Sequence, residues 1–274
     1  MSIVEKAINS AGKGVNQPRT QKLPFAKDIS ERGEVDAEVS IVDVHDLGSK
    51  GMTTILENHE LSKSFRFLKR SVLARIFGSP DSDSSKGKQI MVTSAMPHAG
   101  KSFMAFNLAA SIAQEQLINV VLIDADIVRC NLTELLGVSG RTGLVEALTS
   151  NDLDASVVET SLSGLSFIPS GKPHVNGTEL LASNYMSGLL DALEDPDTVI
   201  VMDTTPLLVT SEADAVAAHV DHVIVVVEAG NTPVEDISRV IQMLEKSNSK
   251  ISFIMNKVAK ITKPGGAYDY QYSK

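Results

Sequence analysis

The stretch SAMPHAGKS, residues 94–102, decides the fold, because it joins a short apolar run to a long helical pattern. A phosphate-binding loop needs a glycine, four further residues and then Gly-Lys-Ser or Gly-Lys-Thr. Gly100, Lys101 and Ser102 match this pattern, whereas Ala95 stands at the position of the first glycine. The apolar run before the loop and the helical pattern after it are the setting that such a loop requires.

The loop predicts a site for a nucleotide and Mg²⁺. Backbone N–H groups of the loop and of the helix N-terminus can surround a phosphate. Lys101 can place a point charge on the phosphate oxygens, and the Ser102 hydroxyl can bind Mg²⁺. The nucleotide-binding residues predicted from the loop are Pro97, His98, Ala99, Gly100, Lys101, Ser102 and Phe103.

Beyond Lys88 the chain alternates short apolar runs with helical patterns. Helices are expected at 102–116, 178–193, 211–219 and 233–246. The alternation predicts an α/β fold with a doubly wound, mostly parallel sheet of the P-loop NTPase type. Ligands of such sheets bind at the carboxyl ends of the strands, so the motifs should lie there. The runs predicted as strands are QIMVTS, NVVLIDAD, LSFIPSG, TVIVMD, HVIVVVEAG and KISFIMN.

Three acidic residues follow predicted strands. Asp124 and Asp126, in VVLIDADIV, point toward the same side, where like charges need a cation or a proton to coexist. Asp203, in VIVMDTTP, stands at the tip of another strand. Each acid alone could equally cap the following helix. Together they predict a Mg²⁺–nucleotide site with Ser102, Asp124 and Asp203 as metal ligands and with Lys101, Asp124, Asp126 and Asp203 as catalytic residues.

Charge and composition limit the class of protein. The formal net charge of −9 argues against a general nucleic-acid binder, since phosphate backbones require a basic surface. No apolar run is long enough to cross a bilayer and no signal-peptide pattern opens the chain. A single cysteine, Cys130, suits a reducing compartment. We therefore expect a soluble, cytoplasmic protein without a nucleic-acid partner.

Charge also marks the predicted domains. Residues 27–60 carry nine acids against three basic residues, a net charge of 3 − 9 = −6. We expect residues 1–60 to form a short N-terminal helix and a flexible or loosely ordered acidic linker, because the acidic stretch lacks clear periodicity. Residues 61–87 are expected to form a basic amphipathic helix and a linker. The nucleotide-binding domain would then span 88–258, followed by a flexible tyrosine-rich tail at 259–274.

The motifs resemble those of the bacterial tyrosine autokinases of polysaccharide export, the BY-kinases. That family carries a Walker A loop, an Asp-x-Asp motif called Walker A′, an Asp-x-x-Pro Walker B motif and a tyrosine-rich tail, in this order. Here they correspond to AMPHAGKS, IDADIVR, VMDTTP and YDYQY. The resemblance covers the chain from about Phe65 to its end, and SIVEKAIN and GKSF look closest to the exosortase-associated subgroup.

The resemblance implies an ATP-dependent protein-tyrosine kinase that uses Mg²⁺ and acts on its own tail. Its phosphoacceptors would be Tyr268, Tyr270 and Tyr272, which enter the site of a neighbouring copy. Such a kinase would regulate exopolysaccharide assembly and export at the inner face of the membrane. A membrane polysaccharide co-polymerase, or chain-length regulator, would recruit and activate it, and a cognate phosphatase would reverse the modification.

Some positions depart from the family pattern. Val128 stands where the family usually has an arginine, with Arg129 one residue later and Cys130 where proline is common. Phe103 replaces a Ser or Thr that reaches the α-phosphate, so only its backbone N–H remains for that contact. The family's Glu-x-x-Arg-x-x-Arg assembly motif reads Lys63, Arg66, Lys69 here. Arg66 and Arg70 could still pair with acids of a neighbouring copy, or could form a solvated helix face.

Other readings stay open. ParA/MinD-type ATPases share the predicted sheet and hydrolyse ATP without phosphorylating protein, but they carry an extra lysine where this chain has Met96, and they lack a tyrosine tail. A degenerate nucleotide-binding adaptor is the third possibility. Asn256 resembles a residue that reads adenine in related ATPases, and it could equally cap a turn. We expect Tyr185 to pack inside its helix, Cys130 to be structural, and His219 and His222 not to bind a metal.

Overall fold

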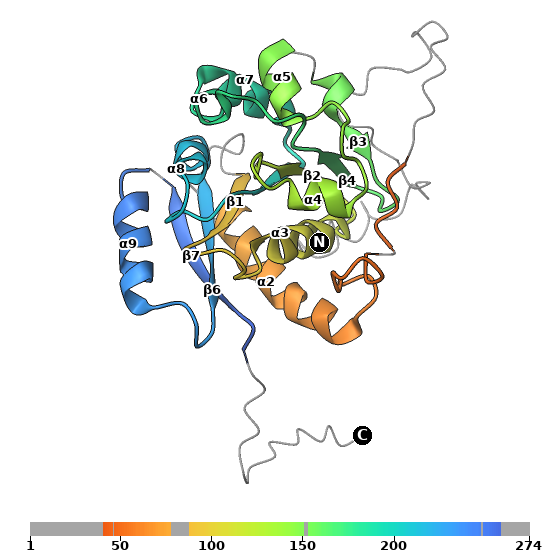
Figure 1. The fold of residues 1–274 in the computed structure, drawn as a ribbon. Coiled ribbons are helices and arrows are strands. Elements are labelled where there is room, and N and C mark those ends of the chain that lie inside the picture. The colour runs from red at the N-terminus through yellow and green to blue at the C-terminus, as the bar shows by residue number, and fades with distance from the viewer. Residues whose placement is uncertain (1–40, 46, 78–87, 151–152, 248, 259–274) are drawn as a thin grey trace, which may run out of the picture. The chain divides into compact units, whose positions relative to one another are not determined.

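The computed structural model describes residues 41–45, 47–77, 88–150, 153–247 and 249–258. Their strands form one seven-stranded sheet in the order β3-β4-β2-β5-β1-β6-β7 (Figure 1). All neighbouring strands are parallel except β3 and β4. The strands are β1 (Gln89–Ser94), β2 (Asn119–Asp124), β3 (Val158–Glu159), β4 (Leu165–Ile168), β5 (Thr198–Asp203), β6 (His222–Glu228) and β7 (Lys250–Asn256).

The predicted doubly wound, mostly parallel sheet is confirmed, and all six predicted strands are present. Strand β3 was not predicted, because two residues carry no periodicity. Strand β7 is not buried on both faces, since Phe253 is 44% exposed and Met255 is 63% exposed. This exposure follows from the position of β7, which is the last strand at one edge of the sheet.

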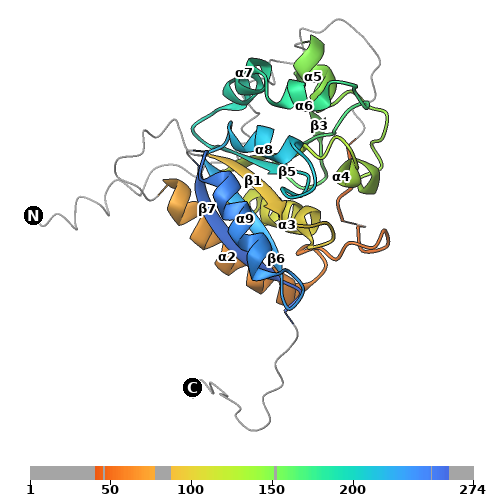
Figure 2. The ribbon, with the colours of Figure 1, turned by 60° about the vertical axis from the view of Figure 1, so that its left-hand side comes forward.

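Helices cover both faces of the sheet. Residues of α2 and α3 share one hydrophobic cluster with alternate strand residues, among them Ile90, Val92 and Leu122. Helix α9 lies on the other side of β6 and β7 from α2 (Figure 2). The helices are α2 (His59–Phe77), α3 (Lys101–Ala113), α4 (Asn131–Leu135), α5 (Leu144–Ser150), the 3₁₀ helix η2 (Asp154–Ser156), α6 (Gly177–Leu181), α7 (Asn184–Leu193), α8 (Glu212–Ala217) and α9 (Val234–Leu244).

The segment before α2 is packed rather than loosely ordered. Val44 and Leu47 are completely buried, and the buried Asn107 of α3 accepts a hydrogen bond from the Ile55 N–H at 2.7 Å. Val42 pairs beside β3, because its N–H donates to the Glu159 carbonyl at 2.9 Å and its carbonyl accepts from the Ser161 N–H at 2.8 Å. The expectation of a flexible linker is therefore wrong for the described part of residues 41–60.

Helix α2 is the predicted basic amphipathic helix, and it begins two residues earlier than expected. Phe65, Val72 and Ile76 face the core, as their helical spacing indicates. Lys69 is also buried, and it forms an ion pair with Glu115 just beyond α3. Among the described residues, no helix combines the length and the apolar character needed to cross a membrane.

A polar contact joins α2 to the two strands at the sheet edge. Arg75 of α2 donates a hydrogen bond to Ser252 Oγ at 2.6 Å, and His222 Nε2 lies 2.8 Å from the same oxygen. Burial lowers the pKa of His222 to about 4, and the positive charges of Arg75 and Lys250 act in the same direction. The imidazole therefore stays neutral at physiological pH.

This lowered pKa predicts acid sensitivity. Since the pKa of His222 falls from about 6.5 in the unfolded chain to about 4 in the folded one, the stabilisation is complete above pH 6.5 and is lost as pH falls toward 4. The total effect is about 3 kcal/mol, because one pKa unit corresponds to about 1.4 kcal/mol. Urea unfolding of wild type and His222→Gln at pH 7 and pH 4.5 measures it, because other titrations cancel in the difference. Equal losses of unfolding free energy in both proteins would contradict the prediction.

Candidate nucleotide site

The loop between β1 and α3 has the backbone of a phosphate-binding loop. His98 and Gly100 adopt left-handed conformations, with φ of 67° and 94°. A Cβ at Gly100 would lie 2.2 Å from Asn256 Nδ2, so a glycine is required here for its φ and for space. Gly100 is the N-cap of α3, which directs the first N–H groups of the helix toward the loop.

The end of β7 holds this loop in place. Asn256 Nδ2 donates a hydrogen bond to the Ala99 carbonyl at 2.9 Å. Lys257 Nζ donates to the His98 carbonyl at 2.7 Å and forms an ion pair with Glu228 at 3.1 Å. Neither Lys257 nor Glu228 was predicted from the sequence, because a lysine after one strand and an acid at the end of another strand match no motif. A nucleotide contact by Asn256 stays a prediction.

Lys101 lies among three carboxylates. Its Nζ is 2.8 Å from Asp126 Oδ2 and 3.9 Å from Asp203 Oδ1, and all three side chains are buried. Burial opposes the positive charge, but Asp203, Asp126 and Asp124 together outweigh it and raise the pKa of Lys101. The lysine is thus a fixed cation, and the structure brings together the residues predicted to be catalytic.

Asp124 is positioned by a residue that the sequence did not point to. Its Oδ2 accepts hydrogen bonds from the Thr133 N–H at 2.9 Å and the Thr133 hydroxyl at 2.8 Å. Burial nevertheless raises the pKa of Asp124 to about 6, against the effect of these two bonds. Asp124 and Asp203 are also partners in the register of β2 and β5, which places both acids at the same end of the sheet.

Asp203 is the least satisfied of the three acids. Its side chain is completely buried, and neither carboxylate oxygen accepts a hydrogen bond of normal geometry from the described residues. Burial raises the pKa of Asp203 to about 7; the charge of Lys101 and the nearby Ser102 hydroxyl oppose this shift, and Asp124 adds to it. A buried carboxylate without donors indicates a cation that completes the site.

The residues fit Mg²⁺ held together with phosphate. Mg²⁺ usually keeps several waters and takes only one or two protein carboxylates besides substrate phosphates. Asp203, Asp124 and the Ser102 hydroxyl could supply these ligands. A cage of three or more His, Cys, Asp or Glu side chains is not present in the described residues. This arrangement therefore suits a metal that arrives with a nucleotide.

The positions that depart from the family pattern have structural explanations. The Phe103 ring packs edge-on against Phe65 of α2, with 6.0 Å between ring centroids, so its side chain faces away from the loop. Val128 and Arg129 are exposed, and the Arg129 N–H donates to Asp126 Oδ1 at 3.0 Å. Cys130 has a φ of 52°, which proline cannot adopt. Burial raises the pKa of its thiol, as in an unreactive cysteine.

The remaining predicted residues lie apart from the loop. Arg66 and Arg70 are exposed on α2. His219 and His222 have different partners, Ser187 Oγ and Ser252 Oγ. The expectation that Tyr185 packs in its helix is wrong, since it is 66% exposed on α7. The predicted helix 178–193 is divided into α6 and α7. Tyr268, Tyr270 and Tyr272 lie outside the described residues.

These features define a P-loop nucleotide-binding domain, and the chain belongs to the AAA domain family, whose model matches residues 87–258. Within this class it resembles kinase domains of bacterial tyrosine kinases, as the sequence motifs predicted. Tyrosine-protein kinase Etk of Escherichia coli K12 is 33% identical over 183 residues, which make up 66% of this chain and 25% of Etk. The solved kinase domain of E. coli ETK is 30% identical with a TM-score of 0.67, covering 77% of this chain and 81% of that domain.

Two further relatives indicate the range of similar proteins. The succinoglycan biosynthesis transport protein ExoP of Rhizobium meliloti is 44% identical over 64 residues, 23% of this chain and 8% of ExoP. A plasmid partition protein of Borrelia burgdorferi bound to AMPPNP is 27% identical with a TM-score of 0.51, covering 64% of this chain and 78% of that protein. The chain thus spans about a quarter of Etk and less of ExoP.

The glycine in the loop provides a test of its geometry. We expect Gly100→Ala to abolish nucleotide binding, because the left-handed φ disfavours a Cβ and because the Cβ would displace the Asn256 amide that holds the Ala99 carbonyl. Gly188→Ala is the matched control, since a Cβ at this exposed position of α7 meets nothing within 4 Å. The control should gain roughly 0.5–1 kcal/mol of stability. Binding of a fluorescent ATP analogue and thermal unfolding of both variants measure the two effects, and normal nucleotide binding by Gly100→Ala would disprove the assignment.

Proposed function

We propose that the protein is a Mg²⁺-ATP-dependent protein-tyrosine autokinase that modifies Tyr268, Tyr270 and Tyr272 of its own tail. The observation that carries the proposal is the buried carboxylate of Asp203. It lies near Lys101 at the Gly100 loop, and no described residue donates a hydrogen bond of normal geometry to it. The similarity to the Etk kinase domain supports protein tyrosine, rather than water, as the phosphoryl acceptor.

Each residue of the site has a proposed role. Lys101 neutralises charge on the transferring phosphoryl group, which requires it to exchange Asp126 for a phosphate oxygen. Asp203, Asp124 and Ser102 would hold the Mg²⁺, which would supply charge stabilisation when bound. Asp124 or Asp126 would accept the proton of the tyrosine hydroxyl as the phosphoryl group is transferred. Asn256 and Lys257 keep the loop carbonyls turned away from the phosphate.

The cellular setting is part of the proposal. The name of ExoP connects this kind of sequence with exopolysaccharide biosynthesis and transport. We propose that the chain regulates exopolysaccharide assembly and export from the cytoplasmic face of the membrane. A membrane polysaccharide co-polymerase would recruit and activate it, a phosphatase would reverse the modification, and Arg66 and Arg70 would contribute to a homo-oligomer in which phosphorylation occurs between copies.

Mass spectrometry tests the activity directly. After incubation with Mg²⁺-ATP, we expect the intact protein to gain successive phosphates that map to the tail, and Lys101→Met to gain none, because the fixed cation of the site is lost. Steady ATP hydrolysis with an unmodified tail would instead support a ParA/MinD-like ATPase switch, to which the partition protein is related in fold. Bound ATP with neither activity would indicate an adaptor.

The acceptors are tested by substitution within the tail. Tyr268→Phe, Tyr270→Phe and Tyr272→Phe should each lower the maximum phosphate count by one, and the triple variant should contain no phosphotyrosine at all. Tyr185→Phe is the matched control, because Tyr185 is exposed yet lies on a helix of the folded domain. An unchanged phosphotyrosine total in the triple variant would refute the tail as substrate.

A further inference from the structure

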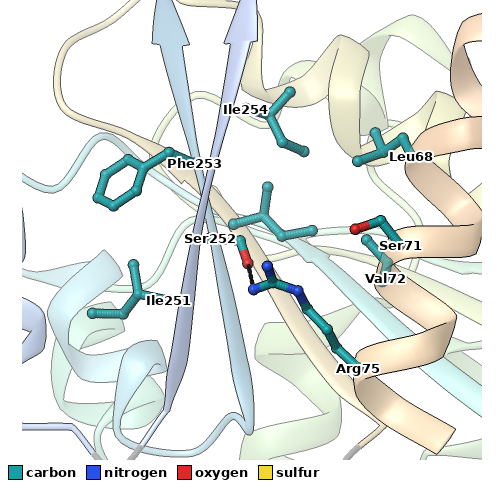
Figure 3. Close-up of a pocket in the computed structure, with 9 residues that line it drawn as sticks. Leu68, Ser71, Val72, Arg75, Ile251, Ser252, Phe253 and Ile254 are labelled. Carbon is teal, nitrogen blue, oxygen red and sulfur yellow. Dashed lines mark hydrogen bonds between the residues drawn. The ribbon is translucent and has the colours of Figure 1, made fainter. Parts of the chain in front are cut away.

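A groove runs between α2 and the free edge of the sheet. It has a volume of about 310 Å³, and α2 contributes Leu68, Ser71, Val72 and Arg75 to one wall. Figure 3 shows Ser252 and Ile254 of β7 pointing toward this wall, whereas Phe253 and Ile251 point to the other side of the strand. The groove therefore has an apolar base and a cationic rim.

Strand β7 presents an open hydrogen-bonding edge to this groove. The Lys250 N–H bonds to Asp221, and the Asn256 carbonyl bonds to Ala229, so the even-numbered residues face β6. Because neighbouring residues of a parallel strand alternate in direction, the N–H and C=O groups of Ile251, Phe253 and Met255 point outward. Within the described residues no strand pairs with this edge. Native proteins seldom leave such an apolar edge uncovered.

The side of the groove toward α2 is basic. Lys250 is exposed at the start of β7, and by alternation its side chain lies on the same side of the strand as Ser252, facing α2. Arg66 and Arg70 are turned away from the groove, because at 3.6 residues per turn they lie on the opposite side of α2 from its lining residues. Arg75 lines the groove and donates to Ser252. A strand that pairs with β7 and carries acids on the side of α2 would match both the open edge and this charge.

The chain contains a segment with this pattern. Residues 34–41 read EVDAEVSI, in which Glu34, Asp36 and Glu38 alternate with apolar residues. We name residues 34–40 the acidic arm. The acidic stretch as a whole lacks periodicity, but the arm has the period of two that places acids on one face of a strand and apolar side chains on the other. Its acids would lie on the side of α2, and its apolar side chains would lie on the side of Phe253 and Met255.

The arm cannot reach β7 of its own copy. Its last residue, Ser40, is followed by Ile41 and Val42, and Val42 is hydrogen-bonded at the β3 edge. The β3 and β7 edges are six strand spacings apart, about 29 Å. Seven fully extended residues span at most about 25 Å, so even Glu34 falls short. A β7 edge that pairs with the arm must therefore belong to a second copy.

We infer that the acidic arm of one copy adds as a strand to β7 of a second copy, with its acids against Arg75 and Lys250. This inference rests on the proposed self-association and names the surfaces that mediate it. The contact is head-to-tail, because it joins opposite edges of two sheets, and such contacts close into rings or extend as filaments. Main-chain hydrogen bonds supply affinity, and the alternating side chains supply register.

Charge reversal in the full-length, dephosphorylated protein without nucleotide tests the contact. Sedimentation velocity should show concentration-dependent association of the wild type at about 100 µM, the range of a weak complex. Glu34→Lys/Asp36→Lys/Glu38→Lys and Arg75→Glu/Lys250→Glu should each raise the dissociation constant at least about tenfold. The two sets combined should return it to within about threefold of the wild type, because opposite charges again face each other. Lys172→Glu/Lys246→Glu, an equal charge change elsewhere, should have no effect.

A labelled peptide of residues 32–42 checks the site independently of assembly. Fluorescence anisotropy should show that it binds to the arm-reversed protein, and Phe253→Asp should weaken this binding at least about tenfold, because a charge opposes the apolar face of the arm. Any of three results would overturn the inference. The wild type could stay monomeric, or the combined variant could fail to associate. A tail peptide of residues 263–274 could also bind the groove in place of the arm peptide. None of these measurements uses ATP, so their failure is separate from a failure of the kinase assignment.

Discussion

The arrangement of this protein depends on one buried cation among three buried acids. Lys101 can stay charged in the interior because Asp126 contacts it and because Asp124 and Asp203 lie nearby. The acids in turn lie at the ends of β2 and β5, whose register puts Asp124 and Asp203 side by side. The carboxyl ends of parallel strands lie at one edge of the sheet. The topology therefore brings together charged residues that are far apart in the sequence.

This charge cluster is incomplete without a ligand. Three acids face one lysine, burial raises the pKa of two of them, and among the described residues none donates a hydrogen bond of normal geometry to Asp203. Binding of a nucleotide with its metal adds both a cation and an anion, which gives Asp203 a partner and gives Lys101 a second one. The buried charges of the site are therefore better paired with Mg²⁺ and phosphate bound than without them. The fold fixes the positions of the side chains, and the ligand supplies the missing charge.

Much of this could be predicted from the sequence, because the signals were local. A loop that matches Gly-Lys-Ser between a strand and a helix, and acids just after buried runs, located Lys101, Asp124, Asp126 and Asp203 at one site. The contacts that depend on the fold could not be predicted. Thr133 reaches Asp124 across a turn, and Lys257 reaches His98 over 159 positions of sequence.

The expectation for the segment before α2 was wrong for a different reason. Its acidic composition suggested a loosely ordered linker, yet Val44, Leu47 and Ile55 are buried against the sheet and α3. Sparse apolar residues without periodicity gave no helix or strand signal, although each of them fills a place in the core. Composition predicts the average environment of a segment, and a few buried side chains suffice to hold it in place.

The attachment of β7 to the phosphate-binding loop limits how the end of the chain can change. Asn256 and Lys257 both bond to carbonyls of the loop, and the described chain ends at Val258. A truncation that is intended to remove only the tail must therefore keep Lys257, because a cut two residues earlier would release the loop as well. Any change to the tail meets the same boundary, since it leaves the anchoring of the loop intact only if it begins after Lys257.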